Sequence, residues 1–318
     1  MTDRATPPLT GPLTGPLTGP LAGPLAGAES LELRLPALTV RALAWGPPTG
    51  PLVLALHGFP DTALTWRHLG PQLAERGYRV VAPYLRGYAP TDVPRDGDYS
   101  VGALMSDAVA LHEALGGDER AVLVGHDWGA LTANGLSAHP DSPFRRIVSM
   151  AVPPIPALSP APGVWPWLRL APRQLRMSWY ILFNQVPLLP ERRLDELVRH
   201  LWAAWSPGYD ATHDLVEVRR SLADPANRSA AIGYYRAFRH LRVSRPYRSW
   251  HRTWDRKPRV PMLYLHGEQD GALAVGFTGR IAPILPEGSR LEVLGGCGHF
   301  LHLERPDEVN RLVADFLE

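Results

Sequence analysis

One stretch decides the fold: Val122-Leu123-Val124-Gly125-His126-Asp127-Trp128-Gly129-Ala130. It joins a short apolar run to the pattern Gly-x-Asp-x-Gly and then to small residues suited to starting a helix. This order predicts a strand, a sharp turn and a helix, with glycines two positions before and two positions after Asp127 so that the chain can turn tightly. Asp127 is the expected nucleophile on that turn. An aspartate is also a common helix cap, so the motif alone leaves a structural role open.

An aspartate at this position narrows the chemistry. Its carboxyl group, with a reference pKa of about 3.9, is already an anion at neutral pH and needs no base for a first attack. Attack on an ester or amide carbonyl would give an anhydride, which collapses back easily. Displacement of a leaving group from a saturated carbon gives an ordinary ester, which water can cleave. Asp127 therefore predicts alkyl transfer from an epoxide or an alkyl halide, followed by hydrolysis.

Length and composition exclude several classes of protein. A chain of 318 residues can form one large core with an inserted subdomain. The formal net charge of +2, without runs of like charge, does not indicate a nucleic-acid partner. The single cysteine, Cys297, excludes an intrachain disulfide and fits a reducing cytoplasm, where we expect the protein. No apolar run is long enough to span a bilayer, so no stable membrane anchor is expected. The sequence does not indicate an oligomeric state.

The N-terminus has a composition of its own. From Gly11 to Ala26 it repeats Gly-Pro-Leu-Thr or Gly-Pro-Leu-Ala in four-residue steps. Proline and glycine at this density cannot sustain a helix or a sheet ladder. We therefore predict that residues 1–28 form a disordered tail without a part in catalysis.

The rest of the chain alternates between strands and helices. This alternation predicts an α/β protein with a mostly parallel sheet covered by helices on both faces. The core should comprise residues 29–152 and 259–318. Residues 153–258, rich in tryptophan, arginine and proline, should form an inserted helical cap over the carboxyl ends of the strands, where ligands bind in such sheets. The expected strands are 31–35, 38–45, 51–56, 79–82, 121–124, 146–151, 261–265 and 290–294, and the expected core helices are 62–75, 101–115 and 307–317.

A nucleophilic carboxylate needs a base for water and a group that orients the base. His299 lies in a glycine-rich turn directly after the last strand and is the expected base. Asp270 follows the strand before it and is the expected orienting acid, preferred over Glu268 because it lies at the far side of the turn. His57 and His126 belong to tight turns and are interpreted as structural.

The sequence also bears on an oxyanion hole and on a metal site. The amides of Phe59 and Trp128 are the expected oxyanion hole, which would stabilise charge on the carboxyl group of Asp127 during ester hydrolysis. His299, His302 and Glu304 could be mistaken for a metal cluster, but their spacing is not His-Glu-x-x-His. We therefore predict no metal and no cofactor.

The chain resembles the epoxide hydrolases of the α/β-hydrolase fold over nearly everything after residue 30. The motifs that carry the resemblance are His57-Gly58-Phe59-Pro60, the aspartate turn at 125–129, Arg86-Gly87-Tyr88, Ser178-Trp179-Tyr180 with Gln185, and Gly233-Tyr234-Tyr235-Arg236. One departure is Tyr84, where related sequences often have aspartate. The order nucleophile, acid, histidine also fits this fold.

The resemblance implies a catalytic set and a substrate. Asp127, His299 and Asp270 would form the catalytic triad, and Tyr180 and Tyr235 would hold the oxygen of a small-molecule epoxide, which is then hydrolysed by water to a vicinal diol. The residues expected to contact the substrate are Trp128, Phe59, Pro60, Trp179 and Phe300.

Two alternatives stay open at this point. A haloalkane or haloacid dehalogenase could use the same aspartate. A halide leaves as a stable anion and needs only N–H donors, whereas the alkoxide from an epoxide is basic enough to take a hydrogen bond or proton from a phenol of pKa about 10. Phe59 lacks the side-chain amide that dehalogenases often place there. The other alternative is a non-catalytic ligand-binding protein on the same scaffold.

Overall fold

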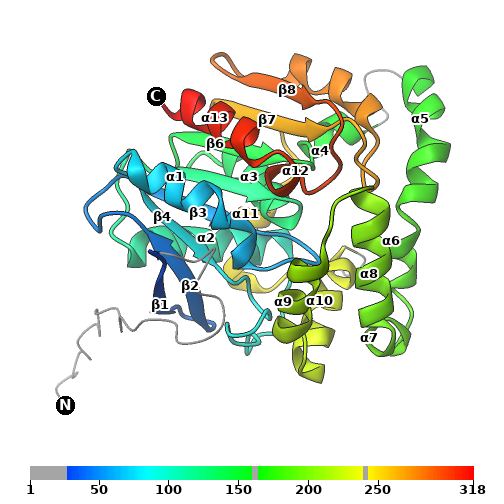
Figure 1. Cartoon of the computed structure of the whole chain (residues 1–318), viewed down its shortest axis with the longest axis horizontal. Helices are drawn as coiled ribbons and strands as arrows, with labels where there is room; N and C mark the ends of the chain where they lie inside the picture. Colours follow the sequence, from blue (N-terminus) through cyan, green and yellow to red (C-terminus); the bar gives the residue numbers. More distant parts are fainter. Residues whose placement is uncertain (1–26, 160–163, 239–242) are drawn as a thin grey trace.

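The computed structural model describes residues 27–159, 164–238 and 243–318 (Figure 1). The predicted N-terminal tail therefore lies almost entirely outside the described residues. Within them, no helix combines the length and apolar character needed to cross a bilayer.

Eight strands form one sheet in the order β1-β2-β4-β3-β5-β6-β7-β8. The pairs β1–β2 and β2–β4 are antiparallel, and all other neighbours are parallel. This confirms the predicted α/β fold with a mostly parallel sheet, and each predicted strand is present. The strands are Glu29–Arg34 (β1), Thr39–Trp45 (β2), Leu52–Leu56 (β3), Arg79–Pro83 (β4), Val122–His126 (β5), Arg146–Met150 (β6), Met262–Gly267 (β7) and Arg290–Leu294 (β8).

Alternation of apolar side chains along the strands explains why helices cover both faces. In β3, Leu52, Leu54 and Leu56 join one buried cluster, whereas Val53 and Ala55 join the other. Helices α2 and α3 pack on the first face, and helices α1 and α13 pack on the second (Figure 1). The bounds are Leu69–Glu75 (α1), Val101–Ala114 (α2), Trp128–Ala138 (α3), Leu301–Glu304 (α12) and Pro306–Leu317 (α13).

One expected helix is divided. We predicted a continuous helix over 62–75, but the structure has a 3-10 helix at Ala63–Arg67 and then α1 from Leu69. Pro71 explains the break, because proline has no backbone N–H and is tolerated in the first turn of a helix but not in its interior. A helix that starts at Leu69 places Pro71 in such a first turn.

Helices dominate the segment between β6 and β7. α5, α6, α7 and α8 stack beside the carboxyl ends of the strands, at the right of Figure 1. The helices of this insertion are Ile155–Leu158 (α4), Val164–Met177 (α5), Trp179–Phe183 (α6), Leu189–Arg192 (α7), Leu194–Trp205 (α8), Thr212–Ser221 (α9), Pro225–Ala237 (α10) and Arg248–His251 (α11), with a 3-10 turn at Arg245–Tyr247. Two more 3-10 turns, Val275–Arg280 and Ala282–Ile284, lie between β7 and β8.

The Arg86-Gly87 segment joins the insertion to the core. The Tyr234 hydroxyl donates to the Arg86 carbonyl at 2.8 Å, and the Asn227 side-chain amide donates to the Gly87 carbonyl at 2.8 Å. Gly87 has a φ of 80°, and a Cβ at this position would clash with Ala230 of α10. Only glycine therefore lets α10 approach this closely. Tyr84, the departure from the family pattern, packs against both buried clusters and contributes to the core.

Candidate active site

Asp127 occupies a sharp turn between β5 and α3. Its φ of 52° is unusual for a residue other than glycine and marks a sharp change of direction. A Cβ at Gly125 would clash with the Gly129 carbonyl, and a Cβ at Gly129 would clash with the Leu56 carbonyl. The two glycines of the Gly-x-Asp-x-Gly motif are thus required by the close approach of the helix to β3 and β5. The turn presents the Asp127 side chain at the carboxyl edge of the sheet.

The loop after β3 contacts the Asp127 carboxylate directly. The Phe59 backbone N–H donates to Asp127 Oδ1 at 2.7 Å. A Cβ at Gly58 would run into the Asp127 side chain, so this position requires glycine. Trp128 follows Asp127 as the first residue of α3. This geometry brings the Phe59 amide to the carboxylate and leaves the Trp128 amide as the candidate second donor.

His299 and Asp270 approach Asp127 from two other loops. His299 Nδ1 donates to Asp270 Oδ2 at 2.9 Å, and His299 Nε2 lies 3.6 Å from Asp127 Oδ2. Asp270 is held in place because its Oδ1 accepts from the backbone N–H groups of Ala272 at 2.7 Å and Leu273 at 2.9 Å. The structure therefore brings together the nucleophile, acid and histidine expected from the sequence.

Glu268, the alternative acid, lies elsewhere. Its side chain is exposed and accepts from the Gly296 backbone N–H at 3.3 Å. Asp270, by contrast, is buried. Of the two candidate acids on this turn, Asp270 and not Glu268 therefore contacts His299.

Burial and neighbouring charges shift the pKa values of His299 and Asp270 in opposite directions. Burial alone would lower the pKa of His299, but the carboxylates of Asp270 and Asp127 outweigh burial and raise it to about 10. Burial also favours the neutral form of Asp270, yet the charge and hydrogen bond of His299 hold the pKa of Asp270 below its usual range. The resting site therefore contains an imidazolium ion held by carboxylates.

Tyr180 and Tyr235 lie above Asp127, on α6 and α10. Their ring centroids are 5.5 Å apart at an interplanar angle of 87°. Both are buried, and burial together with the charge of Asp127 raises the pKa of each hydroxyl well above its usual value. Gln185 couples the two helices because its side-chain N–H donates to the Tyr235 carbonyl at 2.9 Å and the Ile181 carbonyl at 3.2 Å. The hydroxyls are protonated at neutral pH and can donate hydrogen bonds.

A cavity of about 260 Å³ lies between Asp127 and the helical insertion. Asp127, Tyr180 and Tyr235 face this cavity, together with Trp128. Most of its other lining side chains are apolar, including Leu131, Ile155, Trp167, Ile181, Leu273 and Phe277. An apolar cavity with a few polar groups at one end suits a small apolar ligand that carries one reactive polar group.

Several of the residues expected to contact the substrate do not line this cavity. Trp179 is 41% exposed and packs against His200 and Phe183 outside the cavity. Phe300 is buried and stacks on Trp202 with ring centroids 3.6 Å apart. Both side chains therefore point away from the ligand space.

Phe59 and Pro60 do not line this cavity either. The Phe59 ring packs edge-on against Tyr235 at 5.0 Å, and the Pro60 carbonyl accepts from the Trp202 indole at 2.8 Å. These two residues therefore pack against residues around the cavity without lining it. Of the five expected contacts, Trp128 is the one whose side chain borders the cavity.

Two residues that the sequence did not single out hold the site together. The Trp205 backbone carbonyl accepts from the backbone N–H groups of His299 at 2.9 Å and Gly271 at 3.2 Å. The Trp205 ring packs on the His299 imidazole. Gln174 of α5 lines the cavity, donates to the Ala272 carbonyl and accepts from the Ala274 N–H, both at 2.9 Å. Neither role has a local sequence signal, because both depend on contacts between the insertion and loops about a hundred residues away.

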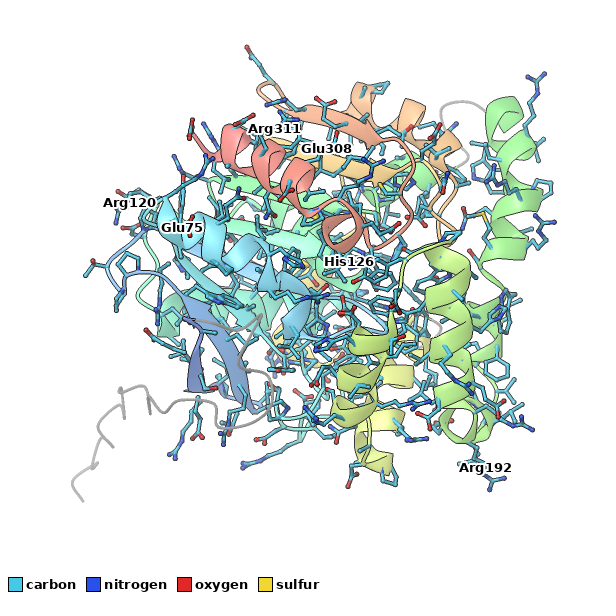
Figure 2. The ribbon with its side chains drawn as sticks, in the orientation of Figure 1. Glu75, Arg120, His126, Arg192, Glu308 and Arg311 are labelled. Atoms are coloured by element: carbon cyan, nitrogen blue, oxygen red, sulfur yellow. The ribbon has the colours of Figure 1, made fainter. Side chains whose placement is uncertain are left out.

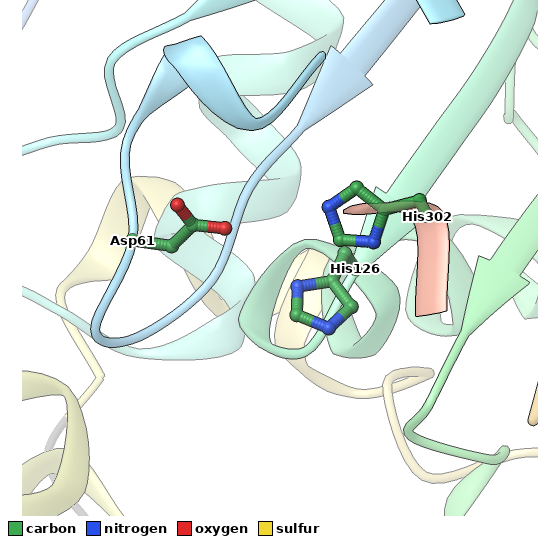
Figure 3. A group of neighbouring side chains, drawn as sticks. All are labelled: Asp61, His126 and His302. Carbon is green, nitrogen blue, oxygen red and sulfur yellow. The ribbon is translucent and has the colours of Figure 1, made fainter. Parts of the chain in front are cut away.

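Asp61, His126 and His302 form a buried group (Figure 3), and the His126 ring lies against the His299 ring with centroids 4.7 Å apart. Their candidate ligand atoms lie within 4.8 Å of one another. His126 Nε2 lies 3.0 Å from the His299 carbonyl, an acceptor, so His126 carries its proton on Nε2 and leaves Nδ1 as a lone pair. Burial lowers the pKa of both imidazoles well below the usual value and raises the pKa of Asp61 to about 8.

This group differs from the set His299, His302 and Glu304 that the sequence places close together. Glu304 accepts from the Ser206 hydroxyl at 2.6 Å and from the Gly298 N–H at 2.8 Å, so it does not converge with His299 and His302. Asp61, His126 and His302 could hold a cation only if Asp61 released its proton. At neutral pH the three are uncharged, and His126 supports the backbone of His299.

Comparisons with known proteins agree with this fold. The model of the alpha/beta hydrolase fold family matches residues 51–306. Epoxide hydrolase A of Mycobacterium tuberculosis is 31% identical over 307 residues, which cover 87% of this chain and 94% of the relative. Epoxide hydrolase 3 of Xenopus tropicalis is 32% identical over 290 residues, which cover 87% of this chain and 74% of the relative.

Solved structures extend the likeness to three dimensions. Epoxide hydrolase A from Mycobacterium thermoresistibile has a TM-score of 0.72 and 26% identity, covering 91% of this chain and 98% of that chain. An epoxide hydrolase from Vigna radiata has a TM-score of 0.74 and 25% identity, covering 92% of this chain and 99% of that chain. The chain thus belongs to the epoxide hydrolase family of the alpha/beta hydrolase fold.

Proposed function

We propose that this protein opens epoxides to vicinal diols through a covalent ester on Asp127. Residues 153–258 act as the cap that closes the substrate cavity over the core formed by 29–152 and 259–318. The proposal is supported most by one observation: two buried, protonated tyrosine hydroxyls share an apolar cavity with a carboxylate.

The first step forms the ester. Asp127 Oδ1 is already held by the Phe59 N–H, so Oδ2 is the oxygen that attacks the less hindered ring carbon. The bond from that carbon to the ring oxygen breaks. The resulting alkoxide takes a proton from Tyr180 or Tyr235, which leaves a tyrosinate. Two donors can stabilise the oxygen throughout the step.

The second step hydrolyses the ester. The tyrosinate is reprotonated at the expense of the His299 imidazolium, through solvent. Neutral His299, oriented by Asp270, then removes a proton from water, and the hydroxide attacks the ester carbonyl. The Phe59 and Trp128 amides stabilise the oxyanion. Collapse breaks the bond from the ester carbonyl carbon to the alkyl oxygen, and the proton left on the Asp127 carboxyl group passes to that oxygen. This releases the diol and restores the Asp127 carboxylate beside the imidazolium formed when His299 deprotonated water, so the net reaction is epoxide plus water to diol.

The tyrosines also favour this reaction over dehalogenation. A departing halide needs no proton, and a protonated phenol next to it offers no advantage that an N–H would not. The alkoxide from an epoxide is a much stronger base than a phenolate, and so it benefits from these hydroxyls.

Mass spectrometry of a His299→Gln variant tests the mechanism. Incubation with styrene oxide should leave an adduct on Asp127, because the ester forms but is not hydrolysed. Asp127→Asn with styrene oxide is the control and should carry no adduct. Absence of an adduct in His299→Gln together with full diol formation by Asp127→Asn would refute the covalent route. Halide release from chloroalkanes without any diol from styrene oxide would instead identify a dehalogenase.

A further inference from the structure

The outer face of the helical insertion carries an unusual set of exposed apolar side chains. In the part of the chain that the structure describes, seven of eleven exposed large apolar side chains fall between residues 168 and 189. Single exposed apolar residues are normal, but such a concentration of them on one segment indicates a binding surface. We call this group the cap patch: Leu168, Leu175, Trp179, Leu182, Val186, Leu188 and Leu189.

The cap patch lies on one edge of the molecule. α5, α6 and α7 follow one another along the side of the insertion that faces away from β1 and β2 (Figure 1). Leu175 and Leu182 are 72% and 74% exposed, which is more than any other large apolar side chain of the described residues. This edge therefore presents apolar surface that the rest of the chain does not cover.

The same segment is strongly basic. Residues 164–193 contain five arginines and one acid, Glu191, which is paired with Arg236. No salt bridge joins Arg169, Arg173 or Arg176 to a carboxylate of the described residues. Arg192 projects away from the molecule at the end of α7 (Figure 2). The charges of Arg169, Arg173 and Arg176 beside the apolar patch are thus not neutralised by a carboxylate of the described residues, whereas Arg193 is paired with Glu196.

The two kinds of side chain alternate along α5 in a regular way. Leu168 and Leu175 are two turns apart on one stripe of the helix, and Arg169, Arg173 and Arg176 form a second stripe one position further on. Apolar and basic stripes side by side, with a tryptophan next to them, are typical of helices that lie in a membrane interface. The apolar side chains enter the lipid while the guanidinium groups reach the phosphates.

We propose that the cap patch docks on the surface of a bilayer that contains anionic lipids. A second copy of the chain is a poorer occupant. A two-fold contact would bring the same patch together on both copies and oppose arginine to arginine. An anionic lipid surface complements both the apolar side chains and the uncompensated charge.

The cavity opens toward the same helices. Leu175 is part of the cap patch and also lines the cavity, and Trp167 and Ile181 line it from α5 and α6. If the proposed epoxide chemistry holds, docking would bring the cavity close to lipid, where apolar epoxides concentrate. The docking itself does not depend on that chemistry.

Sedimentation of the full-length protein with vesicles tests the apolar contribution. The protein should bind phosphatidylcholine vesicles that contain phosphatidylglycerol, and Leu182→Ser/Leu188→Ser should weaken this binding by about tenfold or more. Val93→Ser/Val293→Ser removes exposed apolar side chains outside the patch and should bind like the original protein. Thermal unfolding followed by circular dichroism confirms that both variants are folded.

The basic contribution has its own variant. Each arginine close to an anionic surface contributes on the order of fivefold to binding. Arg169→Gln/Arg173→Gln/Arg176→Gln should therefore lose at least about tenfold, and added salt should weaken binding of the original protein by screening its charge. Arg34→Gln/Arg311→Gln, which changes exposed arginines elsewhere, should bind normally.

Three results would overturn the proposal. One is a failure of the original protein to bind phosphatidylglycerol vesicles at low salt. Another is equal loss of binding in the patch variants and their controls. The third is a dimer, seen by light scattering, that Leu182→Ser/Leu188→Ser dissociates while vesicle binding is absent, which would identify a second copy as the occupant.

Discussion

Replacing Tyr235 with phenylalanine separates the proposed role of its hydroxyl from the packing role of its ring. The ring makes edge-on contacts with Phe59, Trp128 and Tyr180 at centroid distances of 5.0–5.5 Å. Phenylalanine keeps all of these contacts. The hydroxyl is buried and has no hydrogen-bond partner among the described residues. Its removal therefore leaves no protein donor or acceptor without a partner.

The expected effects of Tyr235→Phe on activity and on stability differ greatly in size. Loss of one hydrogen-bond donor to a developing oxyanion reduces the rate by about 10²-fold, which corresponds to about 2.7 kcal/mol. Tyr235→Phe removes no hydrogen bond found between this hydroxyl and the described residues, so the free energy of unfolding should change by less than about 1 kcal/mol.

Tyr234→Phe is the matched control. Tyr234 is the neighbouring buried tyrosine, and its hydroxyl donates to the Arg86 carbonyl at 2.8 Å. Its removal leaves that carbonyl without a partner and should lower the free energy of unfolding by about 1–3 kcal/mol. The effect of Tyr234→Phe on kcat/KM should be small. The two adjacent variants should thus show opposite patterns.

The assay is kcat/KM for hydrolysis of styrene oxide, with stability from urea unfolding. kcat/KM is the proper quantity because it reports ester formation even where ester hydrolysis limits kcat. A Tyr235→Phe protein with kcat/KM within about threefold of the original would refute the proposed donor role. A loss of stability greater than about 1 kcal/mol would refute the claim that the hydroxyl has no partner.

Three further results are expected. As the pH rises from 6.5 to about 10, the free energy of unfolding should fall by about 1.4 kcal/mol per pH unit more than it does in His299→Gln. The reason is that the folded protein keeps a proton on His299 that the unfolded chain releases. Equal slopes for the two proteins in urea titrations would contradict this. In Asp127→Asn, an NMR titration should give a lower pKa for His299, since one of the two carboxylates that raise it is gone; an unchanged value would contradict the electrostatic argument. Trp179→Ala should keep kcat/KM for a water-soluble epoxide within about twofold, whereas Trp167→Ala removes part of the cavity wall and should raise KM. A tenfold loss of kcat/KM in Trp179→Ala would indicate that Trp179 contacts the substrate after all.

The sequence predicts the sheet and the aspartate turn because both depend on local patterns. Continuous apolar runs such as 52–56 are typical of strands buried on both faces, and the structure has β3 there. Gly125 and Gly129 mark the turn because a side chain at either position would clash with a backbone carbonyl. The chain order of Asp127, Asp270 and His299 then follows from the fold.

The lining of the cavity could not be predicted in the same way. Trp179 and Tyr180 are adjacent in the sequence, and successive positions of a helix point about 100° apart, so the packing of α6 decides which of them lines the cavity. The motif does not indicate which of them does. The orientation depends on how α6 packs, including the contact of Tyr180 with Trp205 of α8.

Phe300 and the buried histidines show the same limit. Phe300 follows His299 directly, but its ring is drawn away from the cavity by stacking on Trp202. His126 and His302 come together with Asp61 only because the loop after β3, the end of β5 and α12 meet in the folded protein. Contacts of this kind depend on tertiary packing, and no periodicity or spacing in the sequence encodes them.

Electrostatics connects the two proposed steps within one arrangement of side chains. At rest, the carboxylates of Asp127 and Asp270 raise the pKa of His299 to about 10, so the imidazole is protonated and cannot accept a proton from water. Ester formation neutralises Asp127 and leaves a tyrosinate, which is a strong base. Both changes favour loss of the His299 proton: one support for the imidazolium is gone, and an acceptor has appeared. In the proposed mechanism the base therefore becomes available only after the ester exists, and the charge that returns to Asp127 at the end of hydrolysis again stabilises the imidazolium that formed when His299 took a proton from water.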